Sequence, residues 1–423
     1  MKVTICAYDA YRNLDGPTIW LKRLALFLKE RKVECRIIFF VNRGDRTPLF
    51  DFFLENDFAC TKIYWDLFLE EKIQAVYEDI KMYPPDVFIP QYFVESCEVA
   101  RGISPLGIPS LMIIHNDNAY HYDLVDEFLN NRSFPFIDTV AAVSKSIEEV
   151  LLNKKLNHVN IRYLTYGAPI PKAVKNIERN DKFRIIFTGR FNEEQKRVSL
   201  VAKMLCKLVN EIPDAEAYMY GDGESLPDVL KIIETEGKGA PVYYGGLLTN
   251  DRIQEEFLKS HVYILLSNYE GLPVSLVEAM AAGVVPVCSN MRSGINQVIV
   301  NEQNGFVLND AETELVRVIE KLKSDPQLWS RCSTDARSTI MEMYSVEVCN
   351  DKWLDLIKEL AGKNSCKGNL IVPDISELAN RTYSKTLTFS HTRISRSRIK
   401  NKLYRVKKVL GFVRRRIKLG FLR

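Results

Sequence analysis

Two carboxylates in the stretch "NYEGLPVSLVEAMAAGVVPV" have the spacing of a ligand site. Glu270 and Glu278 are separated by seven residues, and a Gly-Leu-Pro turn follows the first acid directly. Pro273 suits the first turn of a helix, so Glu270 is expected in the preceding loop and Glu278 about one turn inside the helix. Helical side chains lean toward the N-terminus, so both acids can face one crevice. A carboxylate suits adjacent hydroxyls of a sugar or ribose, whereas a lone motif of this kind is also compatible with an ordinary acidic helix start.

Two cations follow a glycine turn in "FTGRFNEEQKR". Gly189, Arg190 and Lys196 come just after an expected strand, and this arrangement suits a diphosphate because Arg binds two oxygens at once. A solvated basic helix start is the alternative. The stretch "MYGDGES" adds Gly221 and Gly223 after the next strand, although it lacks the third glycine of a dinucleotide fingerprint.

The N-terminal part of the chain offers two more candidates at expected strand ends. Gly16 in "NLDGPTIWLKRL" precedes a helix, and a glycine there allows close approach of backbone to a phosphate or sugar. His115 ends the apolar run "SLMIIHND", with Asp117 and Asn118 as adjacent polar candidates. A structural histidine and a plain loop glycine are the alternatives. The spacing of the histidines suggests no metal cluster, and no Asp-x-Asp pair near a strand end calls for a metal.

The elements that position these residues form two series of short apolar runs alternating with amphipathic helices. The first series is "KVTICAY", "ECRIIFFV", "DVFIP", "SLMIIH", "DTVAAVS" and "IRYLTY"; the second is "FRIIFTG", "AEAYMYG", "PVYYGG", "HVYILLS", "VVPVCSN" and "GFVL". Runs of this length separated by helices predict parallel strands buried on both faces. We therefore expect an α/β chain with two doubly wound, Rossmann-like parallel-sheet domains, 1–170 and 183–344, joined by a linker at 171–182.

Charge is distributed unevenly along the 423 residues. From Leu378 onward there are 15 Lys or Arg and no Asp or Glu, so an acidic body carries a basic tail. Within the extension at 362–423, an apolar residue recurs every three or four positions from 399 to 417, which predicts an amphipathic helix. We expect this helix to bind an anionic membrane surface. Docking on the acidic body is the alternative, and nucleic-acid binding is not expected because no binding module accompanies the charge.

The rest of the composition is that of a globular protein. The nine cysteines are scattered without a C-x-x-C pair, which suits reduced thiols better than a disulfide framework or a zinc site. No apolar run approaches the roughly 18 residues of a membrane span, and the start lacks the apolar core of a secretory signal. We expect a cytoplasmic protein, peripheral on the cytoplasmic membrane face through its tail.

These motifs together resemble the retaining glycosyltransferases of the GT-B fold, in the large "glycosyltransferase group 1" class (family four). The resemblance runs from Met1 to about Ala361 and is strongest from Phe187 to Leu308. The stretches that carry it are "FTGRFNEEQKR", "YGDGES", "VYYGGL", "SNYEGLPVSLVEAMAAGVVPV" and "NGFVL", with "AAVSKSIEEVLL" and "YLTYGAPIP" as first-domain support. The two acids in their Gly-Leu-Pro and Glu-Ala-Met-Ala context are the most specific of these features.

The resemblance implies a role for each matched residue. Arg190 and Lys196 would bind the diphosphate of a sugar nucleotide and stabilise the leaving group, Glu270 would contact hydroxyls of the donor sugar, and Glu278 would contact the ribose. His115 would lie near the sugar. The residues that would line the donor pocket are Gly16 from the facing domain, Gly189, Gly221, Gly271, Leu272, Pro273, Val274 and Ser275. Residues 345–361 would form a final helix that crosses back onto the first domain.

The implied activity is retaining transfer of a sugar from a nucleotide-diphosphate sugar to a glycan or lipid-linked acceptor. The place of such an enzyme would be in the synthesis of a cell-surface polysaccharide or glycolipid. The resemblance implies no metal and no cofactor beyond the sugar nucleotide as co-substrate. The alternatives are a nucleotide-sugar epimerase or another GT-B relative, and a non-catalytic scaffold protein that binds a sugar nucleotide. Donor hydrolysis or transfer would distinguish an enzyme from the scaffold.

Overall fold

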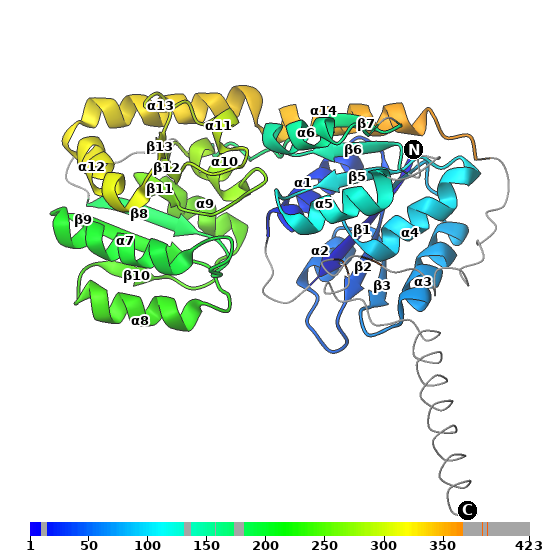
Figure 1. Ribbon diagram of the computed structural model, residues 1–423, viewed down its shortest axis with the longest axis horizontal. Coiled ribbons are helices and arrows are strands. Elements are labelled where there is room, and N and C mark those ends of the chain that lie inside the picture. Colours follow the sequence, from blue (N-terminus) through cyan, green and yellow to red (C-terminus); the bar gives the residue numbers. More distant parts are fainter. Residues whose placement is uncertain are drawn as a thin grey trace, which may run out of the picture.

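The computed structural model arranges parallel β-sheets in two halves that lie side by side, each covered by helices on both faces (Figure 1). It describes residues 1–9, 15–130, 137–156, 158–172 and 182–366, together with Tyr383 and Leu387. The basic tail segment 396–423 and most of the expected linker lie outside the described residues. Within the described part, no helix is both long and apolar enough to cross a membrane.

The first half is built on strands in the order β3-β2-β1-β4, continued by β5-β6-β7. A parallel bridge between Phe88 and Ser110 joins the two groups. The strands are β1 (Lys2–Asp9), β2 (Glu34–Val41), β3 (Ala59–Tyr64), β4 (Val87–Ile89), β5 (Leu111–Ile114), β6 (Thr139–Ala142) and β7 (Asn160–Tyr163). The run Ile37–Phe40 of β2 is fully buried, as expected for a strand with helices on both faces.

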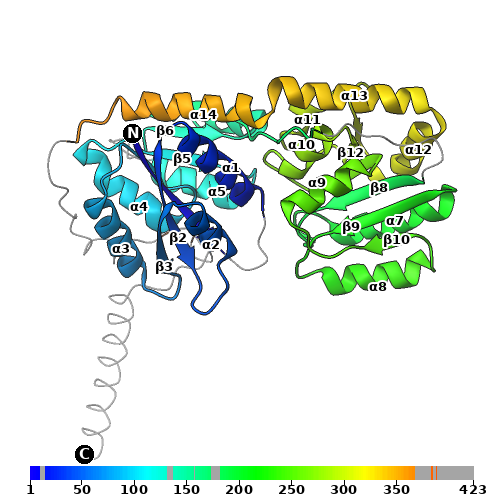
Figure 2. The same ribbon diagram turned by 180° about the vertical axis from the view of Figure 1, so that it is seen from behind.

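The helices of the first half connect successive strands. They are α1 (Gly16–Glu30), α2 (Pro48–Glu55), α3 (Leu69–Met82), α4 (Val94–Ile103), α5 (Ala119–Val125) and α6 (Lys145–Asn153), with short turns η1 (Ser104–Leu106) and η2 (Asp126–Asn130). Helix α5 stands in front of the sheet in Figure 1 and α1 in front of it in the opposite view of Figure 2. Helix α1 begins where the Asp15 carboxylate accepts a hydrogen bond from the Thr18 amide at 3.1 Å, an N-cap followed by a proline in the first turn.

The second half is a six-stranded parallel sheet in the order β10-β9-β8-β11-β12-β13. Its strands are β8 (Phe183–Thr188), β9 (Ala215–Tyr220), β10 (Val242–Tyr244), β11 (Val262–Leu265), β12 (Val285–Ser289) and β13 (Phe306–Leu308). Its helices are α7 (Val198–Glu211), α8 (Leu226–Gly237), α9 (Asn250–Leu258), α10 (Val274–Ala281), α11 (Ile295–Val298), α12 (Ala311–Ser324) and α13 (Pro326–Met343). In both halves the strand order reverses beside the first strand, and ligands of such sheets bind beyond the carboxyl ends at that reversal.

The last helix returns to the first half of the molecule. Helix α13 lies on the second half and α14 (Val346–Ala361) continues along the top of the first, as Figure 1 shows in yellow and orange. At their junction Ser345 pairs with Ala168 in a parallel bridge. Trp353 of α14 packs on Trp20 of α1, with ring centroids 5.0 Å apart, and donates its indole N–H to the Thr165 carbonyl at 2.9 Å. The chain therefore returns to the first half beside Ala168.

The α/β class and the two doubly wound parallel sheets confirm the predicted fold, and each predicted strand is present. The sequence reading missed β3. Among the described residues this strand pairs with β2 alone, and it has one buried residue, Ile63, with a lysine and a threonine among its other positions. An edge strand needs no continuous apolar run, so the pattern used to recognise buried strands does not detect it.

Candidate active site

A cavity of about 550 Å³ lies between the two halves, at the carboxyl ends of the strands of both sheets. The residues predicted to contact the donor all line it, as does the polar candidate Asn118, whereas Asp117 does not. The predicted donor contacts are Gly16, His115, Gly189, Arg190, Lys196, Gly221, Glu270, Gly271, Leu272, Pro273, Val274, Ser275 and Glu278. The volume is that of a small-molecule site. The fold thus brings together in one place residues that are as much as 262 positions apart, from Gly16 to Glu278.

Glu270 is held in a network with the predicted phosphate-binding residues. Lys196 Nζ donates to Glu270 Oε1 at 2.6 Å, and Gln195 Nε2 donates to Glu270 Oε2 at 3.0 Å. Arg190 in turn donates to Gln195 Oε1 at 3.2 Å. Glu270 and Lys196 are both buried. Because each carboxylate oxygen accepts more than one hydrogen bond and an ammonium has three protons, both groups keep capacity for a ligand.

The backbone fixes the two loops that carry this network against each other. The amide of Asn268 donates to the Gln195 carbonyl at 2.8 Å, and the Asn268 side chain donates to the Glu194 carbonyl at 2.7 Å. The Tyr269 hydroxyl adds a bond to the Glu194 carboxylate at 3.0 Å. The loop after β11 and the loop after β8 are therefore one preorganised surface, with an acid and two cations facing the cavity.

Arg190 faces acidic groups of both halves. Burial works against its charge, but Asp15, Tyr8 and Glu270 favour the protonated form, and the net effect raises the pKa of the guanidinium. Asp15 also contacts the Tyr8 hydroxyl. Positive and negative side chains therefore alternate in this part of the cavity, and a guanidinium in such a place suits a phosphate oxygen.

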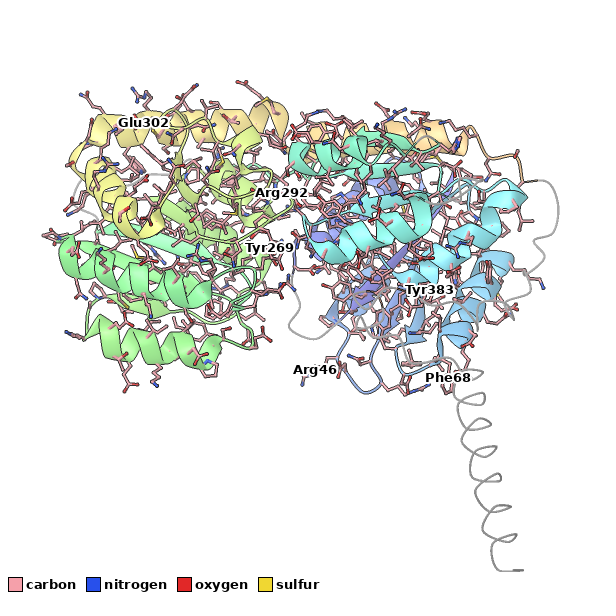
Figure 3. All side chains as sticks on the ribbon, in the orientation of Figure 1. Arg46, Phe68, Tyr269, Arg292, Glu302 and Tyr383 are labelled. Carbon is pink, nitrogen blue, oxygen red and sulfur yellow. The ribbon has the colours of Figure 1, made fainter. Side chains whose placement is uncertain are left out.

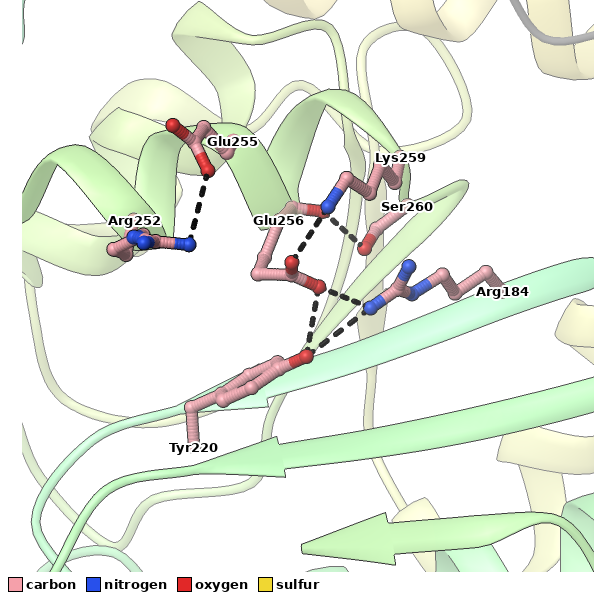
Figure 4. A network of polar contacts seen from close by, with 7 residues as sticks. All are labelled: Arg184, Tyr220, Arg252, Glu255, Glu256, Lys259 and Ser260. Carbon is pink, nitrogen blue, oxygen red and sulfur yellow. Dashed lines mark hydrogen bonds and ion pairs between the residues drawn. The ribbon is translucent and has the colours of Figure 1, made fainter. Parts of the chain in front are cut away.

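The turn after β9 requires glycine at position 221. Gly221 has φ +146°, and a Cβ there would overlap the carbonyl oxygen of Gly189. The neighbouring ring of Tyr220, which also lines the cavity, is held by its hydroxyl (Figure 4). That hydroxyl donates to Glu256 at 2.7 Å and accepts from Arg184 at 3.1 Å. The hydrogen bonds among Tyr220, Glu256 and Arg184 therefore hold this wall of the cavity in place, and they involve none of the residues predicted to bind the donor.

Glu278 pairs with a cation from the opposite half. Arg23 of α1 donates to the Glu278 carboxylate and, through its other terminal nitrogen, to the Gly167 carbonyl at 3.0 Å. Both side chains are largely buried, at 15% and 5% exposed. Arg23 therefore holds Glu278 in one orientation in the middle of α10, where a ribose diol is predicted to bind.

We expect Arg23→Met to raise the KM for the sugar-nucleotide donor about tenfold, equivalent to about 1.4 kcal/mol, with a smaller change in kcat. The reason is that Glu278 would lose both its orientation and its compensating charge. Steady-state kinetics with varied donor measures this. Arg31→Met, at the exposed end of the same helix, is the matched control and should keep the original KM. An unchanged KM in Arg23→Met would show that the ion pair has no part in donor binding.

His115 lies at the cavity but its ring is already engaged. One ring nitrogen contacts the Tyr166 hydroxyl and the other contacts the Gln91 side-chain oxygen. Complete burial lowers the pKa of His115 well below its ordinary value, so the imidazole is neutral. Its backbone carbonyl approaches Gly271 of the other half closely. Both ring nitrogens are therefore engaged at the cavity wall, and the role of His115 near the donor sugar stays a prediction.

Direct contacts hold the two halves together around the cavity. Arg292 Nε donates to Asp117 Oδ2 at 2.9 Å, and the Lys145 amide donates to Gln297 Oε1 at 2.7 Å. Figure 3 shows Arg292 and Tyr269 where the halves meet. Together with Arg23 and Gly271, these contacts describe a closed arrangement in which a bound donor would be shielded from water.

The second half of the molecule matches a known protein family. Residues 171–339 match the model of the family described as "Glycosyl transferases group 1". This half is a group 1 glycosyltransferase domain. The two halves together have the GT-B fold: the structure of Anabaena HepE in complex with UDP-glucose superposes with a TM-score of 0.69 at 15% identity, covering 85% of this chain and 100% of the other. Arg190, Lys196, Glu270 and Glu278 all belong to the group 1 domain.

Two bacterial glycosyltransferases are sequence relatives of this chain. The chain is 25% identical over 182 residues to alpha-D-kanosaminyltransferase of Streptomyces kanamyceticus, which is 43% of this chain and 47% of the relative. It is 22% identical over 295 residues to an α-1,4-N-acetyl-D-galactosaminyltransferase of Campylobacter jejuni that acts on an undecaprenol-diphosphate-linked glycan, and the match covers 69% of this chain and 79% of the relative. The chain thus spans about half of the first relative and about four fifths of the second.

Three residues that contact the predicted site residues were not themselves predicted from the sequence. Gln195 lies within the quoted motif "FNEEQKR", directly before Lys196, but its uncharged amide did not indicate a part in phosphate binding. Asp15 directly precedes Gly16 and is recognisable as an N-cap. Arg23 lies seven residues after Gly16, two turns along the same face of α1, and that helical spacing is the only local signal that it points the same way.

Proposed function

We propose that the chain is a retaining glycosyltransferase that moves a sugar from a nucleoside-diphosphate sugar to a glycan or lipid-linked acceptor, in the synthesis of a cell-surface glycan. The network of Arg190, Gln195, Lys196 and Glu270, with Glu278 nearby in the same interdomain cavity, is the observation that carries this proposal. Its cations suit a diphosphate and its acids suit sugar and ribose hydroxyls. HepE binds UDP-glucose and the two relatives transfer sugars, which supports this class of donor.

In the proposed reaction the bond from the anomeric carbon to the phosphate oxygen breaks, and a bond from that carbon to an acceptor hydroxyl oxygen forms on the same face. The acceptor proton passes to the departing phosphate. Negative charge develops on the leaving group, where Arg190 and Lys196 stabilise it without a metal. Glu270 orients the donor sugar and Glu278 the ribose. Closure of the halves limits transfer to water.

A thermal-unfolding screen with UDP, GDP, ADP and their sugars tests the proposal. The matching nucleotide, at 100 times its dissociation constant, is expected to add about 2.7 kcal/mol to the free energy of unfolding. The matching sugar nucleotide should then be hydrolysed slowly, or transferred when an acceptor is present. Stabilisation without either reaction would favour the scaffold alternative. No stabilisation by any of these nucleotides would contradict the proposed function.

The location of the protein stays a prediction. The amphipathic pattern within 396–423 still favours attachment to an anionic membrane surface, and a lipid-linked acceptor would be presented at such a surface. We propose a cytoplasmic site of action on the inner membrane face on this ground alone.

A further inference from the structure

The first-half wall of the cavity carries a strip of aromatic side chains, Trp65, Phe93 and Tyr92, here called the aromatic strip. All three line the cavity. The rings follow one another with centroids 6.0 Å apart between Trp65 and Phe93 and 4.7 Å apart between Phe93 and Tyr92. Trp65 stacks on Phe40 behind it at 4.9 Å. The strip is therefore a supported apolar surface inside a cavity whose other half is strongly polar.

The strip leads to the reaction centre at its Tyr92 end. The Tyr92 ring lies 5.2 Å from the His115 ring, and the His115 backbone lies against Gly271, next to Glu270. Tyr92 also contributes to the electrostatic surroundings of Arg190. A molecule lying along the strip would therefore present one end to the site where the leaving phosphate and the donor sugar are expected.

A buried ion pair adjoins the other end of the strip. Glu95, at the start of α4, pairs with Lys72 at 2.6 Å, and Lys72 lies 5.0 Å from the centre of the Trp65 ring. Lys72 is fully buried and does not line the cavity, whereas Glu95 does. The pair is neutral as a whole, so it offers carboxylate oxygens to a ligand hydroxyl without attracting an ion.

A neutral histidine stands beside the Tyr92 end. One atom of the Asn118 side-chain amide accepts a hydrogen bond from the His121 backbone N–H at 3.1 Å, so this atom is the oxygen Oδ1. The same oxygen lies 2.8 Å from His121 Nδ1 and accepts a second hydrogen bond from it. Nδ1 therefore carries the proton and Nε2 carries a lone pair. Burial lowers the pKa of His121 to about 3. No described residue donates to Nε2, and His121 lines the cavity, 5.3 Å from the Tyr92 ring.

Positive charge is confined to the other side of the cavity. Among the described residues that line it, the Lys and Arg side chains are Arg190 and Lys196, both in the group 1 domain and both assigned to the donor diphosphate. The aromatic strip and its flanks offer rings and hydrogen-bond acceptors. A phosphate or carboxylate placed there would lose its hydration without gaining a cation, which is costly.

We propose that the aromatic strip binds an uncharged pyranose ring of the acceptor, with the C–H face of the sugar on Trp65, Phe93 and Tyr92 and its hydroxyls donating to Glu95 and His121. Apolar ring faces combined with a few fixed acceptors are the recognition elements that such a ligand needs. This inference rests on the proposed function and names the acceptor class for the same site. Acceptors that react through a polyol phosphate or a hydroxy acid are anionic, and we expect them to bind poorly at the aromatic strip.

The test compares acceptors in the presence of the donor identified by the unfolding screen. The neutral probes are methyl glucopyranosides and methyl galactopyranosides in both anomeric forms, and the anionic probes are sn-glycerol 3-phosphate and L-malate. We expect kcat/KM to be at least tenfold higher for a neutral pyranoside than for either anion. Trp65→Leu should raise the acceptor KM about tenfold and lower the ratio of transfer to donor hydrolysis. Tyr243→Ala, an exposed aromatic residue on β10, should change neither quantity.

His121→Phe supplies a second variant that keeps a ring in place while removing the acceptor nitrogen. It should raise the acceptor KM for the pyranoside as Trp65→Leu does. Equal or better use of the anionic probes, or normal acceptor KM values in both variants, would overturn the inference while leaving the proposed function intact. A protein that neither binds nor hydrolyses any sugar nucleotide would overturn both.

Discussion

Lys196→Ala is expected to lower kcat for sugar transfer by about 10²- to 10³-fold, the loss found when one fixed donor to a developing negative charge is removed. The ammonium is buried, bonded to Glu270 at 2.6 Å, and held by a loop that is tied to the loop after β11. It therefore needs no reorganisation when charge develops on the leaving phosphate. Initial rates at saturating donor and acceptor measure the effect. Lys203→Ala, an exposed lysine on the adjacent helix α7, should keep the original rate.

The same substitution affects stability, and the two effects can be separated. Removing Lys196 leaves the buried Glu270 carboxylate without its cation, at a cost of up to about 3–5 kcal/mol. The double variant Lys196→Met with Glu270→Gln removes both charges and should recover most of the lost free energy of unfolding, while transfer stays low. Recovery of transfer together with stability would show that Lys196 serves the fold and not the reaction. The single variants Lys196→Met and Glu270→Gln complete a double-mutant cycle with the double variant and the original protein, and denaturant unfolding and initial rates are measured on all four.

The sequence was sufficient for the parts of this site that depend on local pattern. Strand ends in parallel sheets converge on one edge, so residues that follow apolar runs, such as Arg190 and His115, are expected at the cavity before any coordinates are known. The same logic fails for β3, whose single buried residue makes no continuous apolar run. It also fails for Trp65 of the aromatic strip, which follows that unrecognised strand, whereas Tyr92 and Phe93 follow the predicted strand β4.

Contacts between the halves were beyond the reach of the sequence. Nothing near Arg23 indicates that it pairs with Glu278, since the two are 255 residues apart and meet only when the domains close. The engagement of His115 by Gln91 and Tyr166 is equally non-local. Spacing predicts that a side chain reaches a site, whereas its hydrogen-bond partners, and hence its protonation and role, depend on which elements the fold places beside it.

Gly271→Ala is expected to lower kcat by about 100-fold or more, because it blocks the approach of the two halves. A Cβ at Gly271 would overlap the carbonyl oxygen of His115, and backbone cannot move aside as a side chain does. The halves must then separate, and a misplacement of about 1 Å between reacting groups costs a rate factor of this order. The affinity for the free nucleoside diphosphate should fall less than kcat, since Arg190, Lys196 and Glu278 all belong to the group 1 domain.

Gly16→Ala provides the graded comparison for the same closure. A Cβ at Gly16 would lie 3.0 Å from a methyl carbon of the Val274 side chain, which can shift by a few tenths of an ångström. We expect a loss of less than about tenfold, as for a mild steric change. Small-angle X-ray scattering with donor bound should show a larger radius of gyration for Gly271→Ala than for Gly16→Ala. Equal activity and equal dimensions in the two variants would mean that transfer does not depend on the closed arrangement, and that Arg23 and Arg292 join the halves for stability alone.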